Sequence, residues 1–166
     1  MDTLWAPWRM EYILGPKPEG CFLCDILREG GDDRANLVLK RGRVCAVVMN
    51  RYPYNNGHLM VAPYRHIARL ADLSPDERLE MMDLLDASVT ALTAAMRPDG
   101  FNAGFNLGRV AGAGLETHLH QHLVPRWNGD TNFMPVIGDT KVIPQALDDL
   151  WAALRPRSEE RRVGKE

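Results

Sequence analysis

Three histidines occupy alternate positions in the run His118-Leu119-His120-Gln121-His122. This spacing constrains the fold more than any other feature, because side chains two positions apart share a face only where the backbone is extended. An apolar run follows at 123–125, so we expect a strand over about 118–125 with all three imidazoles on one face. Such side chains lie ~6.5 to 7 Å apart, which suits a row of imidazoles along one ligand.

The remaining pattern predicts an α+β domain with an antiparallel sheet. Four other strands are expected, at 37–39, 44–49, 58–61 and 101–107, because apolar and β-branched runs alternate there with turn residues. A helix begins at Ser74, where a hydroxyl cap, a proline and an acid three residues after the cap occur together. Its apolar stripe is expected at positions 79, 82, 85, 89, 92 and 96, and a shorter helix is expected from about Pro144 to Leu154.

Length and charge limit the possible functions. A chain of 166 residues with 45% hydrophobic residues fits one domain, and a net charge of −2 argues against binding to long nucleic acids. A small phosphorylated ligand remains compatible, because a few local donors can hold one or two phosphates. The absence of a long apolar run predicts no membrane span, and three cysteines in a chain of this length favour a reducing, cytoplasmic location.

Two chemistries use a face of alternating histidines. The imidazoles could bind zinc and activate water, or the middle one could attack phosphorus and form a covalent intermediate. The small-residue loop at 108–114 favours the second, because glycines let backbone amides approach anionic oxygens closely. The competing structural interpretation is a polar strand face, which fits a single histidine better than three in strict alternation.

The pair Cys21-x-x-Cys24 leaves three interpretations open. Two cysteines can pack as small apolar side chains near the start of a helix. A redox pair is less compatible, since no thioredoxin-like strand and helix pattern surrounds them. A tetrahedral zinc site is the third interpretation, and it requires two further ligands.

The ordered motifs resemble the histidine triad (HIT) family over about residues 20–137. The segment 118–124 is similar to the family signature His-φ-His-φ-His-φ-φ, with glutamine at one spacer. Further likeness lies in the segments at 50–61, 63–67 and 105–108. The segment 122–133 resembles the branch that acts on dinucleoside polyphosphates, which includes bacterial diadenosine tetraphosphate phosphorylases. The resemblance implies a HIT-like fold, with a sheet of about five antiparallel strands plus helices, assembled as a homodimer or homotetramer.

The resemblance also implies roles for individual residues. His120 corresponds to the nucleophile, His118 and His122 to residues that orient it and donate to phosphate, and His58 to a residue that braces the triad. The nucleotide-binding positions correspond to Asn50 for the ribose, and to Asn106, Gly112 and Gly114 for the phosphates. Relatives with the cysteine pair complete a zinc site at positions corresponding to Cys21, Cys24, His66 and His118. Many relatives carry glutamine and serine or threonine where this chain has Gly114 and Leu115, so backbone amides are expected to contact the leaving phosphate.

We therefore expect an enzyme that cleaves a dinucleoside polyphosphate at the α-phosphorus through an AMP-histidine intermediate, with phosphate or water as acceptor. A nucleoside phosphoramidase and a non-catalytic nucleotide sensor are the alternatives. No cofactor is expected in the chemistry, although structural zinc is compatible with the sequence. We expect an N-terminal arm at 1–20, a histidine triad domain at 21–156 and a disordered tail at 157–166. Tyr52 and Tyr54 are expected in a surface turn.

Overall fold

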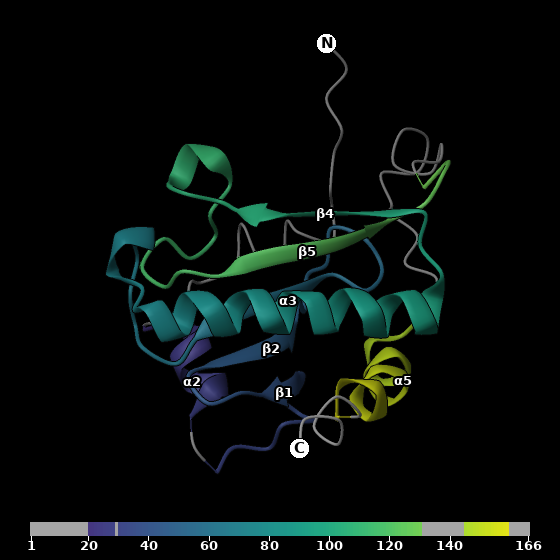
Figure 1. Ribbon diagram of the computed structural model, residues 1–166, viewed down its shortest axis with the longest axis horizontal. Coiled ribbons are helices and arrows are strands. Elements are labelled where there is room, and N and C mark those ends of the chain that lie inside the picture. The colour runs from purple at the N-terminus through teal and green to yellow at the C-terminus, as the bar shows by residue number, and fades with distance from the viewer. Residues whose placement is uncertain (1–19, 29, 131–144, 160–166) are drawn as a thin grey trace.

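The computed structural model describes residues 20–28, 30–130 and 145–159. Five antiparallel strands form one sheet in the order β1-β2-β3-β5-β4 (Figure 1). The expected α+β architecture and the five-stranded sheet are thus confirmed. The strands are β1 (Val38–Arg41), β2 (Cys45–Met49), β3 (Leu59–Pro63), β4 (Gly100–Phe105) and β5 (Gln121–Arg126). Nearly all of the expected arm at 1–20 and the residues from 160 onward lie outside the described residues.

Helix α3 (Pro75–Met96) and helix α5 (Leu147–Glu159) pack against one face of the sheet, and α2 (Phe22–Leu27) packs against the other. Two short 3-10 helices, η1 (Leu70–Asp72) and η2 (Arg109–Ala111), lie in the connections. Figure 1 shows α3 running in nearly the same direction as β4 and β5, with α5 beside β1. The sheet therefore separates an apolar core under α3 from a smaller one under α2. None of the helices among the described residues is long and apolar enough to cross a membrane.

Helix α3 begins as its sequence predicts. Ser74 accepts a hydrogen bond from the backbone N–H of Glu77, and the Glu77 carboxylate accepts one from the N–H of Ser74. This reciprocal pair satisfies two amide groups that the first turn cannot pair internally. The Arg65 guanidinium donates two hydrogen bonds, of 2.6 and 2.7 Å, to the Glu77 carboxylate. These hydrogen bonds lower the pKa of Glu77 to about 2.

The expected apolar stripe of α3 is partly wrong. Leu79 and Met82 are 65% and 57% exposed, whereas the buried face includes Met81, Leu84 and Ser88. The helix is rotated relative to the predicted stripe because small and polar residues also fit beneath it, and the Ser88 hydroxyl donates to the backbone carbonyl of Leu84. Apolar spacing alone did not reveal this, since it ignores buried residues of other types.

One carboxylate of helix α3 accepts several hydrogen bonds from the backbone of the turn between β1 and β2. Glu80 accepts hydrogen bonds of 2.6 to 2.7 Å from the successive backbone N–H groups of Arg43, Val44 and Cys45. A side chain at Gly42 would meet this carboxylate at 2.9 Å, so the close approach requires glycine there. The contact fixes the start of β2 relative to the helix.

Helix α5 covers the outer edge of β1. Trp151 Nε1 and Arg155 both donate to the backbone carbonyl of Val38, at 3.1 and 3.2 Å. The helix starts at Leu147 and continues to Glu159, five residues past the end expected at Leu154 and three past the boundary expected at 156. Arginine, serine and glutamate are compatible with a continuing helix, so a charged composition alone did not mark its end. The other edge of the sheet, β4, has no such cover among the described residues.

Candidate active site and metal centre

The histidine run lies at the start of β5. Only His122 belongs to the hydrogen-bonded strand, and His118 and His120 precede it in a segment tied down by a 2.6 Å bond from Leu119 N–H to the carbonyl of Ile67. Leu119 and Leu123 point into the core beneath α3, which leaves the histidines on the opposite face. The strand is thus shorter than predicted, because no neighbouring strand pairs with its first residues.

His120 is held with one nitrogen toward the backbone. Its Nδ1 lies 2.8 Å from the backbone carbonyl of His118, which can only accept, so Nδ1 carries the proton and donates. The neutral ring then has its lone pair on Nε2, to which no other described residue hydrogen-bonds. Burial lowers the pKa of His120, a residue that is 8% exposed. The ring is therefore neutral at pH 7 and has a nucleophilic Nε2.

His58 and His122 form a second ordered unit. The backbone N–H of Tyr54 donates to His58 Nδ1 at 3.0 Å, and the amide of Asn50 donates to the same atom at 3.3 Å. A neutral His58 must then carry its proton on Nε2, which donates to His122 Nδ1 at 2.8 Å. His122 in turn carries its proton on Nε2. The pair presents an N–H donor close to His120, since the rings of His120 and His122 are 4.9 Å apart.

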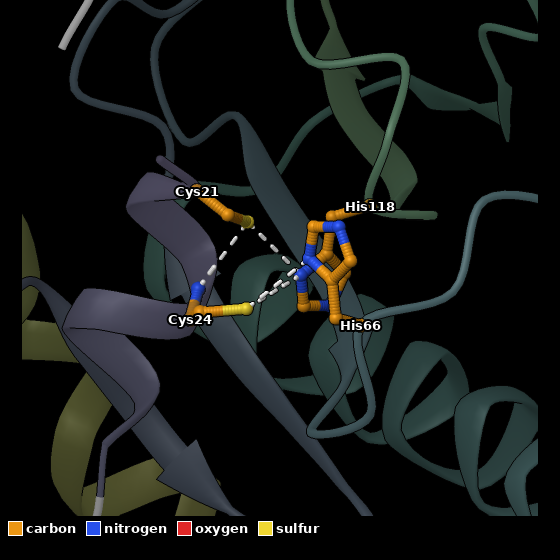
Figure 2. Close-up of side chains that lie close together, drawn as sticks. All are labelled: Cys21, Cys24, His66 and His118. Carbon is orange, nitrogen blue, oxygen red and sulfur yellow. Dashed lines mark hydrogen bonds between the residues drawn. The ribbon is translucent and has the colours of Figure 1, made fainter. Parts of the chain in front are cut away.

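His118 points away from this pair, toward two thiols. Its Nε2 donates to the carbonyl of Pro63 at 2.9 Å, which leaves a lone pair on Nδ1. That nitrogen lies 3.2 Å from Cys21 Sγ and 3.5 Å from Cys24 Sγ. Cys24 Sγ is also 3.3 Å from Nδ1 of His66 (Figure 2). The two nitrogens and two sulfurs converge although the cysteines lie more than 90 residues before His118.

The four ligand atoms suit a tetrahedral ion. All lie within 4.8 Å of one another, and zinc with two sulfur and two nitrogen ligands places neighbouring ligand atoms roughly 3.3 to 3.8 Å apart. Cys21 caps the start of α2 and Cys24 lies in its first turn, so one short helix sets the spacing of both thiols. Burial and the neighbouring Cys21 raise the pKa of Cys24 to about 11, and a divalent cation would supply the charge that favours its thiolate.

A cavity of about 260 Å³ adjoins the histidines. It is lined by the three segments 68–70, 106–108 and 115–116 and by residues 118–120. Gly108 lines it with a positive φ of 83°. Arg69 and Glu116 contribute the two charged side chains of its wall. His120 therefore lines the same cavity as the loop that follows β4.

Several expected site residues have hydrogen-bond partners within the protein, and not all of them line this cavity. Asn50 is engaged with His58, and the amide of Asn106 donates to the carbonyl of Gly112 at 3.3 Å and to the hydroxyl of Tyr54 at 3.2 Å. Gly114 does not line the cavity, whereas its neighbour Leu115 does. His118, expected to donate to phosphate, already has partners for both ring nitrogens.

Tyr54 is the residue that sequence reasoning missed. We expected it in a surface turn, but its ring stacks on His58 at 4.6 Å with an interplanar angle of 24°. It also lies 5.6 Å from the ring of His122. A tyrosine within a stretch of proline, asparagine and glycine carries no local signal for such a position. Its partners are set by the pairing of β3 with β5.

Comparisons with known proteins agree with this fold. The HIT domain family matches residues 31–129. The AP-4-A phosphorylase of Mycobacterium tuberculosis is 42% identical over 159 residues, covering 90% of this chain and 80% of the relative. A hypothetical histidine triad nucleotide-binding protein from Sulfolobus tokodaii has a TM-score of 0.68 at 24% identity, over 87% of this chain and 97% of its own. A Zn-bound histidine triad family protein from Mycobacterium smegmatis has a TM-score of 0.69 at 21% identity. The match covers 88% of this chain and 98% of that protein's chain.

Proposed function

This chain belongs to the HIT family, and from that premise we propose that it cleaves dinucleoside polyphosphates at the α-phosphorus through an AMP-histidine intermediate on His120. It is an enzyme of the nucleotidyl phosphorylase or hydrolase type, as its 42% identity to an AP-4-A phosphorylase supports. The observation that carries the proposed mechanism is the orientation of His120. Its Nδ1 is occupied by a backbone carbonyl, so its lone pair lies on Nε2, and the residue lines the cavity.

The reaction has two displacements. Nε2 of His120 bonds to the α-phosphorus while the bond to the bridging oxygen breaks, and the remaining nucleotide leaves with that electron pair. In this proposal the N–H of His122 donates toward the phosphoryl oxygens or the leaving oxygen, and the hydrogen bond from His58 supports that orientation. Inorganic phosphate or water then attacks the same phosphorus and restores neutral His120, which gives ADP or AMP respectively. The identity to a phosphorylase supports phosphate as the acceptor.

The first experiment tests the nucleophile. Diadenosine tetraphosphate labelled in the α-phosphate should leave an acid-labile, base-stable adduct on the wild-type chain. His120→Ala should lose turnover by about 10⁴-fold or more while still binding AMP, because covalent catalysis requires the ring. Full turnover in that variant would reject the assignment.

Product analysis then separates the acceptors and the alternative substrates. With phosphate present, ADP plus ATP indicates phosphorolysis, whereas AMP plus ATP indicates hydrolysis. Faster release of AMP from AMP-lysine than from diadenosine tetraphosphate would instead indicate a phosphoramidase. Absence of any adduct with every nucleotide tested would favour a nucleotide sensor.

A structural zinc ion is proposed for the cluster formed by Cys21, Cys24, His66 and His118. The sulfur and nitrogen donors and their spacing support zinc, and a structurally similar histidine triad protein is Zn-bound. All four protein ligands fill the tetrahedron, so no open position remains for substrate or water. The ion would stiffen the segment 118–120, while His120 performs the chemistry.

A homodimer is proposed as the assembly. The edge of β1 is covered by α5, whereas none of the described residues covers the edge of β4, where Asn102 and Ala103 are exposed. Uncovered edges present unpaired backbone groups that favour pairing with another strand. A second copy pairing along β4 would continue the sheet across two chains. A homotetramer would require a further interface between such dimers.

A further inference from the structure

Tyr54 contacts both halves of the site. Its ring stacks on the His58 ring with the two centroids 4.6 Å apart, and its centroid is 5.6 Å from that of the His122 ring. Through its hydroxyl it accepts a 3.2 Å hydrogen bond from the amide of Asn106, 52 residues away along the chain. Asn106 in turn donates to the carbonyl of Gly112 in the loop that follows β4. One side chain thus joins the histidine pair to the loop beside the cavity.

We propose that Tyr54 is a positioning residue with two separable effects on the reaction. The ring holds His58 and His122 in the orientation that presents the His122 N–H to the phosphoryl group. The hydroxyl holds Asn106, which lines the cavity, and thereby fixes the wall that contacts the bound nucleotide. This inference rests on the proposed function, because it concerns the same cavity and the same nucleophile.

The direction of each hydrogen bond supports this division. The carbonyl of Gly112 can only accept, so the Asn106 amide nitrogen faces both Gly112 and Tyr54, and the phenolic oxygen is the acceptor. The bond to His58 comes from the backbone N–H of Tyr54 and survives any substitution except proline. Substitutions at position 54 therefore leave the His58 tautomer unchanged and alter only the ring or the hydroxyl.

Two substitutions separate these effects. Tyr54→Phe keeps the stacked ring and removes the acceptor, so KM and the Kd for AMP should rise about 3- to 10-fold while kcat stays within about 2-fold. Tyr54→Leu removes the ring, so kcat should fall about 10- to 100-fold, since small misplacements of catalytic groups are costly. Steady-state kinetics and calorimetric titration with AMP measure the two quantities.

A double-mutant cycle with Asn106→Ala tests the path of the hydroxyl effect. If Tyr54 acts through Asn106, Tyr54→Phe should raise the Kd for AMP no further in the Asn106→Ala background. Tyr64→Phe is the matched control, because it removes a tyrosine hydroxyl that donates to the carbonyl of Gly42, away from the cavity. That control should leave KM and the Kd for AMP unchanged.

The outcomes distinguish this inference from the proposed function. If Tyr54→Phe lowers only the melting temperature, Tyr54 is a packing residue and the inference fails. The inference also fails if Tyr54→Phe raises the Kd for AMP equally with and without the Asn106 side chain, because the hydroxyl then does not act through Asn106. A wild-type chain that binds AMP without cleaving diadenosine tetraphosphate refutes the proposed function, and the AMP titrations still decide the role of Tyr54. A chain that binds no AMP refutes both.

Discussion

Glu77 joins the first turn of α3 to the loop that follows β3. Its carboxylate, on a residue only 2% exposed, accepts from Arg65 and from the backbone of Ser74. These hydrogen bonds keep the pKa of Glu77 near 2, below the ~4.3 of an unfolded chain. The folded state therefore binds this proton more weakly than the unfolded state does. The resulting stabilisation is complete above pH ~4.3 and is lost as the pH falls toward 2.

Glu77→Gln should test that linkage. We expect a loss of about 1–3 kcal/mol in the free energy of unfolding at pH 7, because Arg65 and Ser74 lose a charged acceptor. The difference from wild type should shrink as the pH falls from about 4.5 to 2, where the native glutamate is also protonated. Urea denaturation across this pH range measures the difference in the free energy of unfolding. Asp83→Asn, at an exposed position of the same helix, is the charge-matched control, and an equal pH dependence there would contradict the assignment.

Single residues also mark where sequence reasoning succeeds. The start of α3 follows from Ser74, Pro75 and Glu77 alone, because a helix cap is formed by neighbours within four positions. The partners of Tyr54 lie 4 and 52 residues away, and one of them is reached only after β4 has joined the sheet. No local pattern encodes such a contact.

Helix α2 is the element whose position decides the metal site. It has only six residues, too few for independent stability, and Leu23 and Leu27 anchor it beneath the sheet. Arg41 of β1 adds hydrogen bonds from its guanidinium to the carbonyls of Leu27 and Ile26 at its end. The spacing of Cys21 and Cys24 at its start therefore depends on packing as well as on the cysteines themselves.

Removing one thiol should release the proposed zinc. Cys24→Ser should lower the metal content from about one ion per chain to near zero, because zinc requires all four ligands. EDTA should lower the melting temperature of the wild-type chain by roughly 5–15 °C and should leave that of the variant unchanged. Mass spectrometry of the metal and thermal denaturation provide the two readouts.

The third cysteine provides the control for that experiment. Cys45 lies in the core under α3, where burial raises the pKa of its thiol to about 12. Cys45→Ala removes a thiol that is not part of the cluster, so the zinc content should be retained. Equal metal content in Cys24→Ser and wild type would exclude the cluster as the zinc site.

Strands and helices were predictable to different degrees. All five strands were found because apolar runs and turn residues alternate regularly, although β5 begins three residues later than expected. The spacing of the two cysteines alone did not indicate which residues would complete the metal site, since Cys24 and His118 are 94 residues apart. Resemblance to a family suggested the set, and the packing of α2 beside His118 explains how the four residues meet.

At the scale of the whole molecule, the two edges of the sheet differ. A lysine placed on β4 by Ala103→Lys should shift a homodimer toward the monomer mass of 18.7 kDa, because a lysine on an edge strand disfavours pairing with a second strand. Light scattering coupled to size-exclusion chromatography measures the mass. Ala152→Lys adds the same charge at an exposed position of α5, on the side of β1, and should leave the wild-type mass unchanged. A wild-type monomer would refute the assembly.

Main-chain atoms assign the protons throughout this site. The carbonyls of Pro63 and His118 and the N–H of Tyr54 determine which nitrogen of His118, His120 and His58 carries hydrogen. Side-chain replacement cannot delete a carbonyl, and only proline can delete the N–H. If His120 is the nucleophile as proposed, evolution or a mutational library aimed at the cavity wall can change which substrates enter while the protonated nitrogen of each ring stays the same. Such an arrangement permits the range of substrates to change without any change in the proposed nucleophile.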